Sequence, residues 1–149
     1  MREGAPGRGN RRMPERHCYL NTDLELVSKE DPGRLVDRLE ALGWISLHSE
    51  AVEDGFWRSC LETRCVRPLT PNDTIISMLN DLEELPTQLF DVWRRCTKRE
   101  FNIGLDAAAG RFEIAYDLTN QTLRRVAGLG ASLTLTIYPR LRGGRKWST

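Results

Sequence analysis

The sequence lacks a long hydrophobic run and has few residues that bind metals or act as nucleophiles. Its 149 residues include two histidines and four cysteines, and no cysteines show the short Cys-x-x-Cys spacing of common zinc sites. No apolar stretch approaches membrane-spanning length, and none follows the arginines of residues 1–16 as it would in a secretory signal. We therefore expect a cytoplasmic protein with free thiols and with no membrane segment, metal or cofactor.

Motifs for catalysis are also scarce. The Gly-x-Gly at residues 128–130 comes after a helical pattern and enters a strand, which is typical of a helix end and not of a phosphate-binding loop. Cys60 is the one candidate nucleophile, with His48 opposite it in a predicted hairpin. A surface histidine beside a buried thiol is the competing interpretation, so an enzyme is the least supported class.

Charge is divided unevenly along a chain whose net charge is only +1. Residues 1–16 carry five arginines and two glutamates, and residues 139–149 carry four basic residues and no acid. The intervening residues must then be acidic, with a net charge of −6. We expect one domain at residues 17–139, between flexible basic tails at 1–16 and 140–149. Only these tails could contact nucleic acid, and short solubilising extensions are the favoured interpretation of them.

The spacing of apolar residues predicts alternating strands and helices. Strands are expected where apolar and polar residues alternate, at residues 19–27, 44–52, 56–65, 101–106, 112–116 and 133–138. Helices are expected where apolar residues recur at helical spacing, at residues 32–42, 71–85, 87–96 and 119–129. Around Leu85 we expect either a division into two helices or one clear kink, because Pro86 inside a helix clashes with the preceding turn. A turn is expected around Gly110.

Strict alternation indicates strands that have one covered and one solvated face. Helices must then cover the apolar face. The sequence therefore predicts an α+β fold: a two-layer α/β sandwich, ferredoxin-like or related, with a mostly antiparallel sheet and helices on one face. In the first strand, Leu20, Leu24 and Leu26 should face the helices, and in the next strand Ile45 and Leu47 should do so.

The C-terminal third resembles a known family. The run L-x-R-V-A-x-L-G-A-S-L-T-L-x-I-Y, at residues 123–138, is similar to the end of the bacterial family called domain of unknown function 4279. The segments GFWRSCLET and LNDLEELPTQL are compatible with it, and the resemblance spans residues 18–139. It implies a fold and no catalytic residues. Similar proteins occur in toxin-immunity settings, which implies a binding role.

The solvated sheet face is the best candidate for a functional surface, because aromatic residues among mixed charges are typical of interaction surfaces. The residues expected to project from it together are Tyr19, Asp23, Trp44, His48, Arg58, Glu62, Arg64, Asp106 and Tyr138. A merely hydrated sheet face is the competing interpretation. We expect a non-enzymatic module that binds a protein partner through this face or through an acidic helix flank at Asp81, Glu83 and Glu84. A ligand-sensing regulatory domain is the alternative. A second copy of the chain, forming a homodimer, is a further candidate partner.

Overall fold

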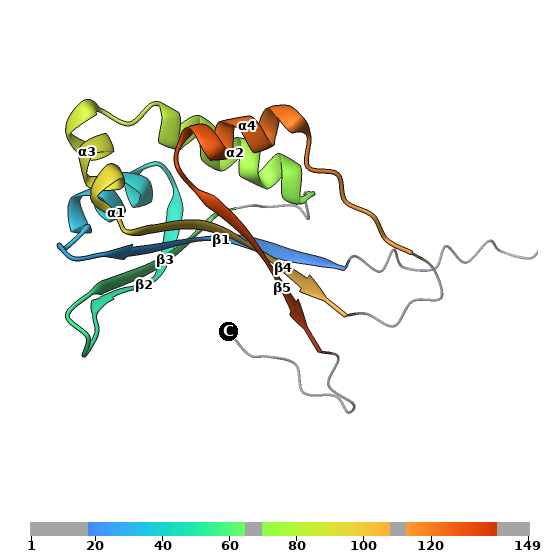
Figure 1. Cartoon of the computed structure of the whole chain (residues 1–149), viewed down its shortest axis with the longest axis horizontal. Coiled ribbons are helices and arrows are strands. Elements are labelled where there is room, and N and C mark those ends of the chain that lie inside the picture. Colours follow the sequence, from blue (N-terminus) through green and yellow to red (C-terminus); the bar gives the residue numbers. More distant parts are fainter. Residues whose placement is uncertain (1–17, 65–69, 108–112, 140–149) are drawn as a thin grey trace, which may run out of the picture.

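The computed structural model describes residues 18–64, 70–107 and 113–139. These residues form an α+β structure in which four helices lie together on one face of a five-stranded sheet (Figure 1). The open sheet fits the predicted two-layer sandwich. The predicted tails at 1–16 and 140–149, and the predicted turn at Gly110, lie outside the described residues.

Nine elements follow one another along the described chain. They are β1 (Tyr19–Ser28), α1 (Gly33–Ala41), β2 (Trp44–Ala51), β3 (Trp57–Thr63), α2 (Pro71–Glu83), α3 (Thr87–Arg95), β4 (Lys98–Asp106), α4 (Asn120–Gly128) and β5 (Ser132–Tyr138). This order agrees with the prediction except that residues 113–116, the described part of the strand expected at 112–116, form no strand.

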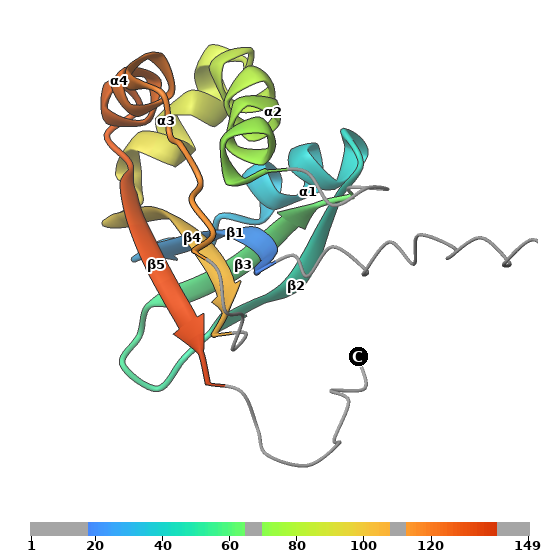
Figure 2. The same ribbon diagram turned by 90° about the vertical axis from the view of Figure 1, so that its right-hand side faces the viewer.

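The sheet is mixed, with strand order β2-β3-β1-β4-β5. Strand β1 pairs antiparallel with β3 and with β4, and β2 pairs antiparallel with β3. Only β5 pairs in the parallel sense, with β4. The predicted hairpin of residues 44–52 and 56–65 is confirmed as β2 and β3. Strands β2 and β5 are the two edges of the sheet, and β5 is the outermost strand in Figure 2.

Helix boundaries follow the local signals in the sequence. Thr70 precedes Pro71 and accepts a hydrogen bond from the backbone N–H of Asp73, which satisfies one of the free donors at the start of α2. Thr119 caps α4 in the same way. Pro86 separates α2 from α3, as expected. Gly43 ends the α1 region with a φ of 99°, a conformation that favours glycine.

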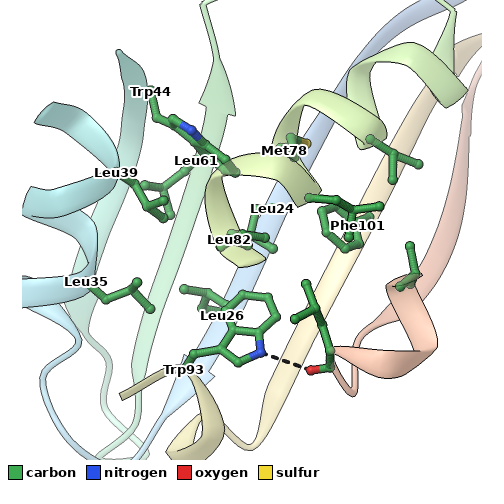
Figure 3. Close-up of a cluster of buried hydrophobic side chains, with 14 of the residues drawn as sticks. Leu24, Leu26, Leu35, Leu39, Trp44, Leu61, Met78, Leu82, Trp93 and Phe101 are labelled. Carbon is green, nitrogen blue, oxygen red and sulfur yellow. Dashed lines mark hydrogen bonds between the residues drawn. The ribbon is translucent and has the colours of Figure 1, made fainter. Parts of the chain in front are cut away.

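The core lies between the helices and the inner sheet face (Figure 3). Fully buried side chains reach it from the sheet, including Leu24, Leu61 and Phe101, and from the helices, including Met78 and Trp93. The indole nitrogen of Trp93 donates to the backbone oxygen of Leu129 at 2.9 Å, which joins α3 to the end of α4. Burial of these side chains is the main force holding the two layers together.

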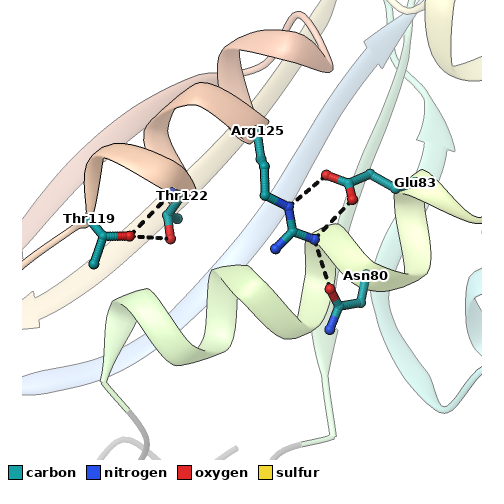
Figure 4. A network of polar contacts seen from close by, with 5 residues as sticks. All are labelled: Asn80, Glu83, Thr119, Thr122 and Arg125. Carbon is teal, nitrogen blue, oxygen red and sulfur yellow. Dashed lines mark hydrogen bonds and ion pairs between the residues drawn. The ribbon is translucent and has the colours of Figure 1, made fainter.

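A polar contact joins α4 to α2 at the surface of the helical layer (Figure 4). The guanidinium of Arg125 donates to both carboxylate oxygens of Glu83, at 2.8 and 2.9 Å, and to Asn80 at 2.7 Å. A bidentate pair fixes the relative orientation of its partners more tightly than a single contact does. The contact therefore adds a specific polar link between α2 and α4.

The predicted strand at 112–116 is wrong for its described part, since residues 113–119 have no regular secondary structure. Tyr116 instead lies against Tyr19, with ring centroids 6.1 Å apart, and its hydroxyl accepts from the Tyr19 backbone N–H at 3.1 Å. Its aromatic ring therefore packs against the end of the core in place of joining the sheet. Alternation alone does not distinguish apolar residues of a strand from apolar residues of an irregular segment that packs against the core.

Candidate functional site

The sheet face away from the helices is covered by no described element (Figure 1). We call it the open face. Its side chains lie in rows across the strands, because cross-strand partners project from the same side of a sheet. One row contains Ile45, Glu62, Asp23, Asn102 and Thr134, and the next contains His48, Cys60, Glu25, Glu100 and Ser132.

Four carboxylates gather at the centre of the open face. Asp23 on β1 is the cross-strand partner of Glu62 on β3, and Glu25 on β1 is the partner of Glu100 on β4. We call these four residues the acidic cluster. Like charges directly opposite one another destabilise a sheet, so this arrangement needs compensation from neighbouring groups or from a bound partner.

Part of the compensation comes from β4 and β5. The ammonium of Lys98 lies 3.2 Å from a carboxylate oxygen of Glu25 and 3.1 Å from one of Glu100. The amide of Asn102 donates to Glu25 at 3.0 Å, and Thr136 donates to Asn102 at 2.7 Å. The hydrogen bond from Asn102 is the main reason that the pKa of Glu25 lies below its usual value, and Lys98 lowers it further.

The negative charge of Asp23 is compensated less well than that of Glu25. Burial raises its pKa to about 6, and the negative charges of Glu62 and Glu25 add to this effect. Its hydrogen bond from the side-chain amide of Asn21, at 2.9 Å, does not reverse the shift. The negative charge of Asp23 is therefore unfavourable near neutral pH, because it is partly buried and lies beside other carboxylates.

Cys60 lies on the open face, and its register partner across the hairpin is His48, as the sequence predicts. Burial raises the pKa of the Cys60 thiol to about 12, and the charges of Asp23, Glu25 and Glu62 raise it as well. A thiol with such a pKa stays protonated at neutral pH, whereas nucleophilic cysteines need the thiolate. The structure therefore gives Cys60 the electrostatic surroundings of an unreactive thiol.

Tyr19 and Trp44 do not lie on the open face, so their prediction there is wrong. Both are buried on the helix side, where the Tyr19 hydroxyl donates to Thr74 at 3.0 Å and the Trp44 indole donates to Asp81 at 2.7 Å. An irregularity in pairing between Tyr19 and Asn21 turns Tyr19 inward.

The same irregularity leaves Leu20 exposed on β1, against the expectation that it faces the helices. Strand β2 shows a second inversion, with Trp44 inward and Ile45 beside Glu62 on the open face. A register shift between Ser46 and His48 then returns His48 to the open face. One extra residue at a bulge reverses the side on which all following residues lie.

The other predicted residues lie farther from the acidic cluster or at its border. Arg58 on β3 forms an exposed ion pair with Asp54 at 2.8 Å. Arg64 is exposed just after β3 ends, and Asp106 and Tyr138 are register partners at the far ends of β4 and β5. Asp23 and Glu62 are thus brought together, while these residues are spread along the strands.

Lys98 and Glu100 were missed by the sequence prediction. The predicted strand started at Phe101, whereas β4 begins at Lys98. Extending the alternation of Phe101, Ile103 and Leu105 backward by two residues places Glu100 and Lys98 on the solvated side. Only the pairing of β4 with β1, however, reveals that they meet Glu25.

Among the residues that the structure describes, no three His, Cys, Asp or Glu side chains are arranged to hold a metal ion. In the same residues, none of the helices combines the length and apolar character needed to span a membrane. In comparisons with known proteins, no family model, no curated protein and no solved structure matches the chain.

Proposed function

We propose that this chain is a protein-binding module whose open face receives a basic segment of a partner protein. The observation that carries the proposal is the acidic cluster, four carboxylates centred on a sheet face that no described element covers. Lysine and arginine side chains complement such a surface, and charge complementarity speeds and orients association.

The state of Asp23 favours a cationic partner over a neutral one. A carboxylate whose pKa is raised to about 6 by burial and by neighbouring acids gains from any cation placed beside it. Binding of a lysine or arginine near Asp23 should therefore lower its pKa and release the strain between Asp23 and Glu62. The same coupling predicts tighter binding at neutral pH than at pH 5.

The acidic cluster is better suited to binding a partner than to catalysis. Glu25 and Glu100 share Lys98, so two of the carboxylates are already neutralised in part by an ion-pair network. Cys60, the candidate nucleophile, has a pKa of about 12. A binding role also agrees with the one implied by the resemblance to the domain of unknown function 4279, which remains a proposal for this chain.

We further infer that β1–β4, with α1 and the α2–α3 pair, are arranged as in the ferredoxin-like fold. The order β2-β3-β1-β4, with every neighbouring pair antiparallel, supports this assignment. On this view α4 and β5 are an addition at one edge. The assignment concerns the scaffold of the open face and does not affect the binding proposal.

The test is a titration of the isotope-labelled full chain with a synthetic lysine- and arginine-rich peptide, followed by NMR. We expect saturable shifts at the backbone amides of the acidic cluster, and weaker binding as salt is raised. An acidic peptide of equal length should cause no such shifts. The proposal fails if the basic peptide leaves these amides unchanged or if both peptides act alike.

Charge-reversing variants locate the binding surface. Glu62→Lys should weaken binding of the basic peptide about 10-fold or more, since it replaces attraction at the cluster with repulsion. Glu84→Lys, on the exposed acidic flank of α2, is the matched control and should bind as the unmodified chain does. The reverse result would place the interaction on the helix flank instead.

A further inference from the structure

The two edges of the sheet differ in how they are protected. Edge strands of monomeric proteins commonly carry charges, prolines or bulges that discourage pairing with another strand. Strand β2 has such features, because its pairing is shifted between Ser46 and His48 and it contains Glu50. Strand β5, with the sequence SLTLTIY, has no charged residue, proline or glycine, and its pairing with β4 is regular.

Strand β5 also exposes large apolar side chains. Leu135 and Ile137 are 62% and 64% exposed, although their register partners Ile103 and Leu105 on β4 face the helical layer. The apolar inner face of the sheet therefore continues onto β5 beyond the cover that the helices give. Contiguous exposed apolar residues on an unprotected edge indicate an interaction site.

The sequence of β5 is complementary to itself in the antiparallel direction. If two copies of β5 pair about a two-fold axis at Leu135, the midpoint of the strand, all seven residues of each strand find partners. Leu133 then faces Ile137 of the other copy, Thr134 faces Thr136, and Ser132 faces Tyr138. Apolar residues meet apolar residues on the inner side, hydroxyls meet on the open side, and no charges oppose one another.

We propose that the chain forms a homodimer in which two β5 strands pair antiparallel about Leu135, joining both sheets into one. The interface is isologous, as expected for a two-fold dimer. A contact made mainly by a single pair of strands is small, so the dimer should be reversible and concentration-dependent. The two open faces would lie on the same side of the joined sheet.

Sedimentation velocity of the full chain over a concentration series tests the proposal. We expect a shift from the 17.1 kDa monomer toward a species of twice that mass. Leu135→Lys should abolish the shift, because the two-fold axis would bring two ammonium groups face to face. Leu47→Lys on the other edge is the control, since Leu47 is also exposed, at 51%, and should leave the dimer intact.

Mixing charge variants tests the register itself. Leu135→Lys and Leu135→Glu should each be monomeric, and an equimolar mixture should recover the dimer, while circular dichroism confirms that both are folded. A monomer at every concentration of the unmodified chain would overturn the proposal, as would a dimer that survives Leu135→Lys but not Leu47→Lys. Failure of the mixture to associate would overturn the register centred on Leu135.

Discussion

The two faces of the sheet are stabilised by different interactions, although their residues alternate along the same strands. Along β4, Phe101 and Ile103 point into the core and are almost fully buried, while Glu100 and Asn102 point to the open face and join the polar network around Glu25. The inner face is held by apolar burial. The open face is held by hydrogen bonds and ion pairs whose net contribution is small.

This difference implies that stability and function reside on opposite sides of the sheet. Loss of an inner side chain leaves a cavity that the close-packed core fills only in part. Loss of an open-face side chain changes the charge and the hydrogen bonding of a surface that water reaches. Substitutions on the open face should therefore alter binding, and they should change the free energy of unfolding less than substitutions in the core do.

The largest expected effect compares adjacent residues of β4. Phe101→Ala should lower the free energy of unfolding by about 3–5 kcal/mol, because it empties a fully buried site between the helices and the sheet. Asn102→Ala, one residue later on the open face, should cost about 1 kcal/mol through loss of its hydrogen bond to Glu25. Urea unfolding followed by circular dichroism measures both. Equal losses would contradict the division of roles between the faces.

A smaller effect tests the face on which Trp44 lies. Trp44→Phe should lower the free energy of unfolding by about 1.5 kcal/mol, because it removes the indole N–H that donates to the Asp81 carboxylate and leaves that charge without this donor. In the Asp81→Ala background the same substitution should cost much less, and a double-mutant cycle by urea unfolding gives the coupling. A coupling near zero would mean that Trp44 faces solvent, as the alternation of β2 had predicted.

Much of the fold could be predicted because its signals are local. Alternation located β1, β2 and β3, and Pro86 and Thr119 marked helix boundaries that the structure confirms. The errors arose where a tertiary contact overrode the pattern. Tyr19 and Trp44 face the core because shifts in pairing reverse the alternation, and such shifts leave no clear trace in a single sequence.

The candidate site was predicted less completely than the fold, because it depends on which strands become neighbours. The contact of Asp23 with Glu62 requires β1 beside β3, and that of Glu25 with Glu100 requires β1 beside β4. Both pairings join segments far apart in the sequence. The sequence identified a charged face, but the convergence of its acids into one cluster follows from strand order, which alternation does not specify.

The smallest expected effect concerns Asp23 on the open face. The pKa of Asp23, about 6 in the folded chain against an ordinary value of 3.8, means that the folded state binds more protons than the unfolded state between these values. Stability linked to Asp23 therefore falls as pH rises through this interval. Asp23→Asn removes this pH-dependent fall in stability. It should therefore stabilise the protein at pH 7 by about 1 kcal/mol, after allowance for solvent screening.

A neighbouring residue supplies the control with the opposite sign. The pKa of Glu25 is lowered, chiefly by the hydrogen bond from Asn102, so its charge stabilises the folded chain above the unfolded pKa of 4.5, and that contribution is lost as pH falls below it. Glu25→Gln should therefore destabilise the protein at pH 7, where Asp23→Asn stabilises it. Thermal unfolding of both variants from pH 4 to pH 7 should give differences from the unmodified chain that diverge in opposite directions as pH rises. Parallel curves would mean that the charge of Asp23 does not destabilise the folded chain. The electrostatic argument for a cationic partner would then lose its basis.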